Sequence, residues 1–337
     1  MVPSMSDIGT ISQNDFKSIT GTNSVKQYPG KEKIKFEINQ SKKNMTNNNS
    51  SRNTQEKPLD IQSDRSNGGQ TQSFSGMQTF SFIGNKNKYG KKEGFGIQKW
   101  KDGSTYKGSF AEGKASGWGI FYHADGDIFN GQFEKGITKG YGEYTHDKGA
   151  VYYGYFLDDI QNGIGYEIWT ENSTYYGNYK NGKKDGICTY SWSDDTKYEG
   201  EWKENLMDGY GIYYFKNGRI YKGQWKESKI QGYGEFTWVE GKKYYGFYQK
   251  DKKDGFGIYY WPEEKFFIGF WKEGKQHGIS KYIKGKQIKY CRWKNGKKDK
   301  IYLNEDQFFN CFEPEEEKYL VYFKWDINKI KEYMEIK

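Results

Sequence analysis

Side chains of the types that carry out acid–base or nucleophilic chemistry are few and scattered in this sequence. The histidines and cysteines number three each: His123, His146, His277, Cys188, Cys291 and Cys311. The cysteine spacing fits neither a Cys-x-x-Cys metal site nor a disulfide framework. The sequence has no Gly-x-x-x-x-Gly-Lys-Ser/Thr phosphate loop and no protein-kinase signature. We therefore expect that the protein is not an enzyme and that it has no catalytic residue, no cofactor and no metal.

Composition points to a core built from aromatic rings. The 337 residues include 31 Tyr, 22 Phe and 11 Trp, and 43 are glycine, whereas the hydrophobic fraction is only 34%. Globular chains usually have about 45–50% apolar residues. No run of about 18 apolar residues predicts a membrane-spanning helix, and the N-terminal segment lacks the apolar stretch of a secretory signal. We expect a cytoplasmic protein in a reducing compartment, with a formal net charge of +9.

The composition divides the chain into three parts. Residues 1–77 are rich in Ser, Thr, Asn, Gln and Lys, with a low-complexity stretch at 41–55. Such a segment buries too little apolar surface to offset its ordering entropy, so we predict a disordered arm. Residues 78–303 are periodic, and residues 304–337 form a tail that loses the period.

Two glycine columns mark the period of the middle part. An aromatic-x-Gly triplet recurs with its glycines 24 and then 23 residues apart, and a second glycine recurs every 23 residues in phase with it. The triplet glycines are Gly84, Gly108, Gly131, Gly154, Gly177, Gly200, Gly223, Gly246 and Gly269. The second column is Gly94, Gly117, Gly140, Gly163, Gly186, Gly209, Gly232, Gly255 and Gly278. A fixed period of this length is typical of repeat architectures.

Each unit is expected to fold as one β-hairpin. In residues 106–128, a strand from Tyr106 to Phe110 precedes a turn and a second strand from Gly117 to about His123. Because glycine has no Cβ, a ring from a neighbouring strand can lie flat on the backbone there. A lone hairpin is marginally stable in water. We therefore predict an all-β protein: an elongated single-layer antiparallel sheet of nine stacked hairpins plus a degenerate tenth, with a short C-terminal helix.

These units resemble the MORN repeat, whose pattern is Tyr-x-Gly-x-aromatic-x-x-Gly-x-x-x-Gly-x-Gly. Good copies lie at 106–119 and 221–234, and the resemblance covers residues 82–303. It implies a scaffold made of stacked hairpins. Similar arrays occur in radial-spoke head components of cilia, in junction proteins that tether membranes, in basal-complex scaffolds and in plant phosphoinositide kinases. Kinase activity is not implied for this chain, because it has no kinase signature.

The ring-lined face is the first candidate binding surface. A single-layer sheet cannot bury both faces, so a partner helix or a second copy of the chain could occupy this face and form a homodimer. The alternative is that the rings pack only on one another. The candidate residues are Phe110, Phe133, Phe156, Tyr179, Trp202, Trp225, Tyr248 and Trp271.

A lysine-lined edge is the second candidate. Four lysine pairs fall in the same hairpin turn of their repeats, where stacking would align them for acidic phospholipids or acidic protein segments. A solvated turn is the alternative, and we expect no nucleic-acid partner because the rings pack on each other. The pairs are Lys91 and Lys92, Lys183 and Lys184, Lys252 and Lys253, and Lys297 and Lys298.

The tail is the third candidate. Glu313 and Pro314 suit a helix start, and five apolar residues then follow at steps of three and four, which predicts an amphipathic helix. This helix either docks another chain or folds back to cap the last hairpin, and the run from Tyr319 to Trp325 could instead be a strand. The apolar stripe comprises Leu320, Phe323, Ile327, Ile330 and Met334.

Together these features predict a non-catalytic scaffold or adaptor that holds protein partners along a rigid β-ribbon. By resemblance, we expect its partners in a ciliary axonemal or cortical cytoskeletal assembly. The alternative function is a peripheral membrane tether that binds acidic phospholipids through the lysine-lined edge.

Overall fold

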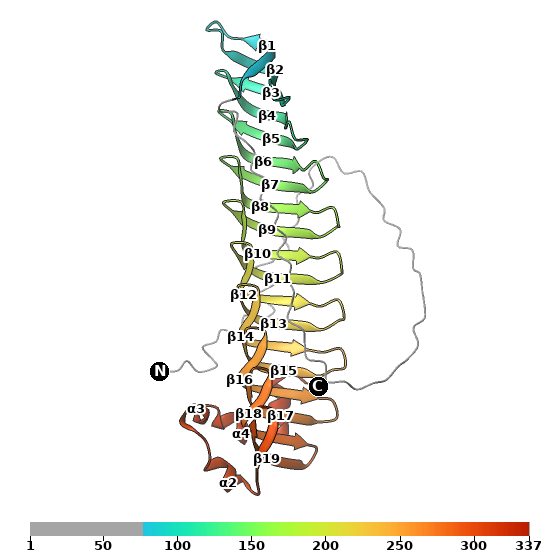
Figure 1. Ribbon diagram of the computed structural model, residues 1–337, viewed down its shortest axis with the longest axis vertical. Helices are drawn as coiled ribbons and strands as arrows, with labels where there is room; N and C mark the ends of the chain where they lie inside the picture. Colours follow the sequence, from blue (N-terminus) through green and yellow to red (C-terminus); the bar gives the residue numbers. More distant parts are fainter. Residues whose placement is uncertain (1–76, 337) are drawn as a thin grey trace, which may run out of the picture. The chain divides into compact units, whose positions relative to one another are not determined.

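The computed structural model describes residues 77–336. Within them, twenty strands pair antiparallel with their neighbours in chain order, so one hairpin follows another along the array (Figure 1). This confirms the predicted single-layer antiparallel sheet. The predicted disordered arm lies outside the described residues, apart from Met77.

The ten hairpins include the degenerate tenth, which is formed by the last two strands. The strands are β1 (Thr79–Lys86), β2 (Lys92–Trp100), β3 (Thr105–Ala111), β4 (Lys114–Tyr122), β5 (Ile128–Glu134), β6 (Ile137–Thr145), β7 (Val151–Leu157), β8 (Ile160–Ile168), β9 (Thr174–Lys180), β10 (Lys183–Ser191), β11 (Lys197–Lys203), β12 (Leu206–Tyr214), β13 (Ile220–Lys226), β14 (Lys229–Thr237), β15 (Lys243–Gln249), β16 (Lys252–Trp261), β17 (Lys265–Lys272), β18 (Lys275–Lys284), β19 (Gln287–Lys294) and β20 (Lys297–Tyr302).

A continuous row of glycines crosses the sheet from strand to strand. Gly108 lies opposite Gly96 on one side and opposite Gly119 on the other, and the same pairing repeats along the array. Larger residues interrupt the row at Cys188, Ser280 and Cys291. The row defines the ring face, because the triplet rings lie on it; the opposite surface of the sheet is the back face.

Each triplet ring lies directly against this bare backbone. A Cβ built on Gly108 or Gly119 would come closer than 3.0 Å to the ring of Tyr106, which is fully buried. The pairing register shifts just after Gly108, and there the Tyr106 hydroxyl donates a hydrogen bond of 2.9 Å to the Ser109 carbonyl oxygen. The buried phenol thus has a hydrogen-bond partner on the backbone.

The rings also join consecutive repeats. Tyr106 meets Phe110 of its own repeat edge-on at 5.1 Å between ring centroids, and Phe133 of the next repeat at 5.0 Å. Edge-to-face pairs of this kind stabilise by about 0.5–1.5 kcal/mol beyond the buried area. The core is therefore a chain of aromatic contacts along the array, as the sequence predicted.

The glycines of the second column adopt a backbone conformation that other residues rarely adopt. Gly117 has φ +85°, in the left-handed region that other residues adopt only with strain. It lies between Ala115 and Gly119, where the pairing of β4 with β3 shifts register, while the pairing of β4 with β5 stays regular. A recurring glycine at this position allows the same shift in pairing register within successive hairpins.

The tail forms four short helices rather than one. They are α2 (Glu305–Phe309), α3 (Pro314–Glu317), α4 (Leu320–Lys324) and α5 (Ile327–Tyr333). Glu313 and Pro314 do begin a helix, α3, with a capping box between Glu313 and Glu316. None of the described helices is long and apolar enough to span a membrane.

The predicted single amphipathic helix is wrong: it is divided into α4 and α5 at the point where a side chain of the sheet binds the backbone carbonyl oxygens. The buried ammonium of Lys281 on β18 binds the carbonyl oxygens of Phe323 at 2.8 Å and Trp325 at 3.1 Å. Trp325 is extended, and Asp326 caps the next helix by accepting a bond from the Lys329 amide. The run from Tyr319 to Trp325, considered as a strand, is mainly helix α4.

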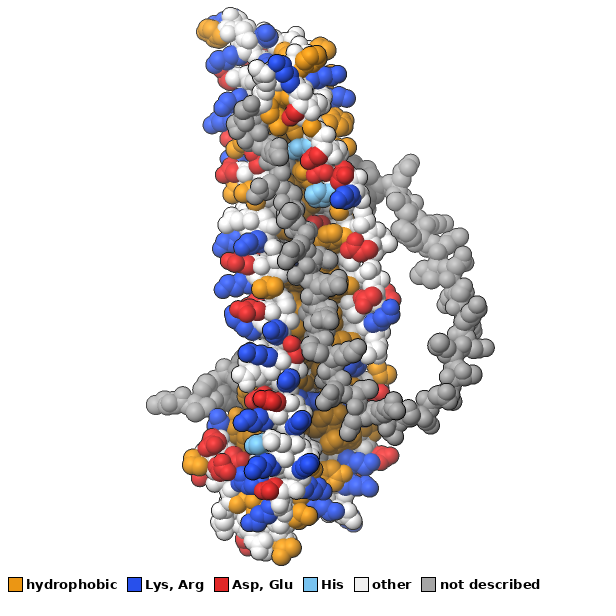
Figure 2. All heavy atoms as spheres, viewed as in Figure 1, with side chains coloured by type: hydrophobic (Ala, Val, Ile, Leu, Met, Phe, Trp, Pro, Cys, Tyr) orange, Lys and Arg blue, Asp and Glu red, His pale blue; other side chains and the backbone are white. Residues whose placement is uncertain are grey.

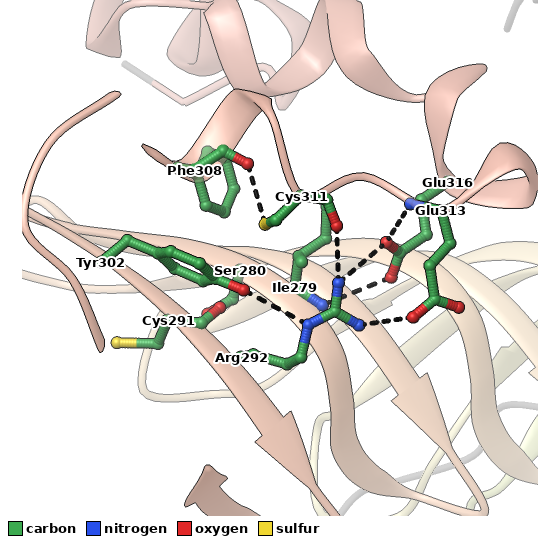
Figure 3. A network of polar contacts seen from close by, with 9 residues as sticks. All are labelled: Ile279, Ser280, Cys291, Arg292, Tyr302, Phe308, Cys311, Glu313 and Glu316. Atoms are coloured by element: carbon green, nitrogen blue, oxygen red, sulfur yellow. Dashed lines mark hydrogen bonds and ion pairs between the residues drawn. The ribbon is translucent and has the colours of Figure 1, made fainter. Parts of the chain in front are cut away.

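A polar cluster anchors the start of the tail to β19 (Figure 3). The Arg292 guanidinium donates to Glu313 Oε1 and to the Cys311 carbonyl oxygen, both at 2.8 Å. It also lies 3.6 Å from the carboxylate of Glu316, a buried residue that accepts from the Ile279 amide. Hydrogen bonds to a charged group are stronger than neutral ones, so this cluster fixes α3 on the last strands.

Replacing Gly211 by alanine should destabilise the array. The new Cβ would lie closer than 3.0 Å to the Tyr198 ring, and overpacking costs about 1–3 kcal/mol of unfolding free energy. We expect G211A to lower the urea midpoint. In a Tyr198→Ala background the ring is absent, so the same substitution should cost much less; an equal cost in both backgrounds would contradict the ring-on-glycine explanation.

Replacing Phe323 by alanine should release the tail from the sheet. Phe323 is fully buried, and truncating such a ring costs about 3–5 kcal/mol. We expect faster amide hydrogen exchange in α4 and α5, while β2–β12 stay protected. Val321→Ala is the matched control, since Val321 is exposed on the same helix. Similar exchange in F323A and V321A would show that this ring does not hold the tail.

Candidate protein-binding surfaces

The eight predicted ring-face residues lie in the core. Their exposed fractions are 3–9%, and they pack on the triplet rings of their own and neighbouring repeats. Tyr106, for example, lies between two of them, Phe110 and Phe133. These residues therefore hold the array together, and their contact with a partner stays a prediction.

The lysine pairs are split between the two faces of the sheet. Lys91, Lys183 and Lys252 are exposed, whereas the second lysine of each of these pairs turns toward the ring face. The Lys253 ammonium lies 5.0 Å from the centroid of Trp238. Side chains alternate along a strand, so two adjacent lysines cannot share one surface.

The outward lysines are partly neutralised. Lys91 pairs with Glu112 at 2.6 Å and Lys183 with Glu204 at 3.4 Å. Lys297 and Lys298 are both exposed on β20. Figure 2 shows basic and acidic side chains interspersed along the array. Binding of acidic lipids or acidic partners by this edge stays a prediction.

A buried ion pair occupies the ring face in the middle of the array. The Lys184 ammonium lies 3.6 Å from Glu167 and 4.6 Å from the centroid of Trp169. Tyr179 donates a 2.6 Å hydrogen bond to the same carboxylate. Glu167 stands in a column that is aromatic in most other repeats. The cluster is packed on all sides, which suits a structural role.

The side chains that could do chemistry are separated or buried. Burial lowers the pKa of His123 and raises the pKa of the Cys188 thiol, so neither group favours its charged form. His146 pairs with Asp127 at 3.2 Å. In the described range, no three His, Cys, Asp or Glu residues gather in a way that could hold a metal ion.

The predicted tail stripe covers the back face of the last repeats. Phe323, Ile330 and Met334 are fully buried, and Leu320 and Ile327 are half-buried. This is the fold-back arrangement that the sequence left open. Docking of a second chain by these residues stays a prediction.

A row of apolar residues on the back face was missed by the sequence analysis. The residue that follows the second-column glycine is large and apolar in all nine repeats, and it faces away from the rings. We call this row the back-face stripe: Phe95, Trp118, Tyr141, Ile164, Ile187, Tyr210, Tyr233, Phe256 and Ile279. The signal was present in the sequence as a regular column of large apolar residues.

The stripe is covered at one end and open at the other. Tyr233 meets Tyr333 through their hydroxyls at 2.6 Å, and Phe256 stacks on Tyr319 at 4.6 Å between ring centroids. Toward the N-terminal end, Phe95 is 68% exposed, Trp118 55% and Ile164 52%. An exposed row of large apolar side chains is typical of a protein-binding surface.

The comparisons with known proteins agree with the repeat architecture. The family model of the MORN repeat matches eight segments, at residues 88–105, 106–128, 129–151, 175–197, 198–218, 221–243, 244–263 and 267–283. The unmatched unit between 151 and 175 is the one that contains Glu167. No curated protein matches the chain significantly.

Solved structures give distant matches. The wild-type TCP10 domain of Danio rerio CPAP is 13% identical, with 61% of this chain and 98% of that chain covered and a TM-score of 0.35. The SAS-4 TCP domain of Drosophila melanogaster, solved with a proline-rich motif of Ana2, is 15% identical over 57% and 90% of the two chains, with a TM-score of 0.26. The eight matched repeats and the hairpins that they form show that this chain belongs to the MORN-repeat family.

Proposed function

We propose that this MORN-repeat protein is a non-catalytic scaffold that holds protein partners along the back face of its sheet. One observation carries the proposal: the back-face stripe continues from the seat of the chain's own tail into repeats where nothing in the described part of the chain covers it. Its exposed N-terminal members give a partner a row of apolar contacts.

The tail shows what kind of segment this face accepts. It places aromatic and aliphatic side chains from short helices on the stripe and on neighbouring residues such as Phe270, which Tyr319 meets edge-on at 5.4 Å. Polar groups of the sheet then bind the helix ends, as Tyr245 does when its hydroxyl donates to the Met334 carbonyl oxygen at 3.0 Å. A partner segment of the same chemistry, an amphipathic helix, suits the open end.

The spacing of the stripe favours a long helix. One stripe residue lies on every second strand, so neighbours are about 10 Å apart. Seven residues of an α-helix rise about 10.5 Å. A helix that runs along the array and carries one apolar residue per heptad would therefore meet successive stripe residues, while polar sheet residues such as Gln132 and Asn178 lie between them.

The proposed location is a ciliary axonemal or cortical cytoskeletal assembly. Its support is the resemblance of the repeats to scaffold arrays found in such assemblies. The non-catalytic role is supported by the burial or separation of the histidines and cysteines described above. Tagging the protein in its native cell tests the location directly, and a diffuse distribution would count against it.

Replacing Phe95, Trp118 and Ile164 together by serine should remove partner binding without unfolding the array, because all three are exposed. Quantitative affinity purification from the native cell should recover partners with heptad-patterned helices, and the variant should lose them. A recombinant helical fragment of such a partner should then bind the variant at least tenfold more weakly than the unmodified chain.

The matched control replaces three exposed apolar residues off the stripe, Tyr89, Val239 and Leu303, by serine. This control should bind the fragment as the unmodified chain does. Equal binding by the stripe variant and the control would reject the back face as the partner surface.

A further inference from the structure

A cavity of about 430 Å³ lies on the ring face near the N-terminal end of the array. Three buried rings line it: Trp100, Tyr106 and Phe110. Three lysines also line it: Lys92, Lys114 and Lys135. The volume is in the range of about 300–1,000 Å³ that is common for ligand pockets.

The cavity exists because of one small residue. The position two before the second glycine of each repeat lies on the ring face, opposite a core ring, and Met207 and Ile230 fill it opposite Trp202 and Trp225. In the second repeat this position is Ala115, opposite Phe110. Alanine is the smallest residue in the column, so the space between the rings stays open here.

The polar groups of the cavity favour an anion. No acidic side chain is among its described lining residues. The Lys92 ammonium donates a hydrogen bond to the Gln98 amide oxygen. Three repeats later, the column of Gln98 holds Glu167, whose carboxylate pairs with Lys184. Burial, followed by repulsion from Lys86, lowers the pKa of Lys92. A carboxylate brought to this site would supply the counter-charge that the described lining of the cavity lacks.

We propose that this cavity binds an acidic peptide segment of a protein partner, which inserts one large apolar side chain between the rings and sets its carboxylates near the lysines. The inference rests on the proposed function in that the ligand belongs to a protein. It concerns the opposite face of the sheet from the stripe. A phospholipid headgroup would meet the lysines but has no group that fills the space between three rings, so a peptide suits the cavity better.

The test measures fluorescence anisotropy of labelled peptides with the full chain. The probe is Asp-Glu-Trp-Glu-Asp, and its counterparts are Asp-Glu-Ala-Glu-Asp, Asn-Gln-Trp-Gln-Asn and Lys-Arg-Trp-Arg-Lys. The acidic tryptophan peptide should bind at least tenfold more tightly than each counterpart, and added salt should weaken it because the attraction is electrostatic. Equal or tighter binding of any counterpart would overturn the proposal.

Filling the cavity provides the decisive variant. Ala115→Met puts into the second repeat the residue that the array already buries at Met207, so the fold should persist, and peptide affinity should fall at least tenfold. Ser116→Met adds the same side chain one residue along, toward the back face, and should leave affinity unchanged. Unchanged binding in A115M, or an equal loss in S116M, would overturn the proposal.

Two further arms separate this site from other surfaces. Any binding to phosphatidylserine vesicles should be the same in A115M and in the unmodified chain. If A115M abolishes vesicle binding and the peptide does not bind, the cavity is a lipid site and the peptide proposal is wrong. The triple serine variant of the back-face stripe should bind the peptide normally. Its loss of the peptide would overturn the cavity, whereas failure of the cavity alone leaves the stripe and the scaffold function standing.

Discussion

The contact between an aromatic ring and bare glycine backbone is the interaction on which this sheet depends. A hairpin has no core of its own. Most hairpins here gain a core because the ring of the first strand lies on glycines, where an added Cβ would collide with it. The ring also meets rings of the next repeat. This contact recurs in most units, so it fixes the triplet-glycine column and the period.

Because of this constraint, the rings of the ring face are buried in the core, whereas large side chains of the back face stay exposed to solvent over part of the array. Over most of the array the ring face is filled by packed rings, and its largest side chains are almost wholly buried. The ring contact places no such demand on the back face, yet the residue that follows the second-column glycine is large and apolar in every repeat. The tail covers only the last of these residues. The contact between the tail and the last stripe residues is thus an example, within the chain itself, of helical segments packed on this face.

Local, repeated requirements made most of the fold predictable from the sequence, and contacts between distant residues did not. The glycine and ring columns recur nine times, so they predicted the hairpins and their stacking. The break between α4 and α5 depends on Lys281, more than 40 residues away, whose ammonium binds carbonyls at that point. The cavity at Ala115 was equally hidden, because its size depends on how three rings from β2 and β3 pack around a small side chain. The split of the lysine pairs, by contrast, follows from strand alternation and could have been inferred.

In an array with such a uniform backbone, individuality must come from positions that the ring contact does not constrain. The interior column opposite the core rings is one: it holds Ala115 where the ring face is open, Lys184 where an ion pair closes it, and Met207 where it is filled by an apolar chain. These positions lie outside the glycine row, so the residue type there can vary while the period is kept. The order of these residues along the chain therefore gives the repeats different surfaces even though their backbones are alike.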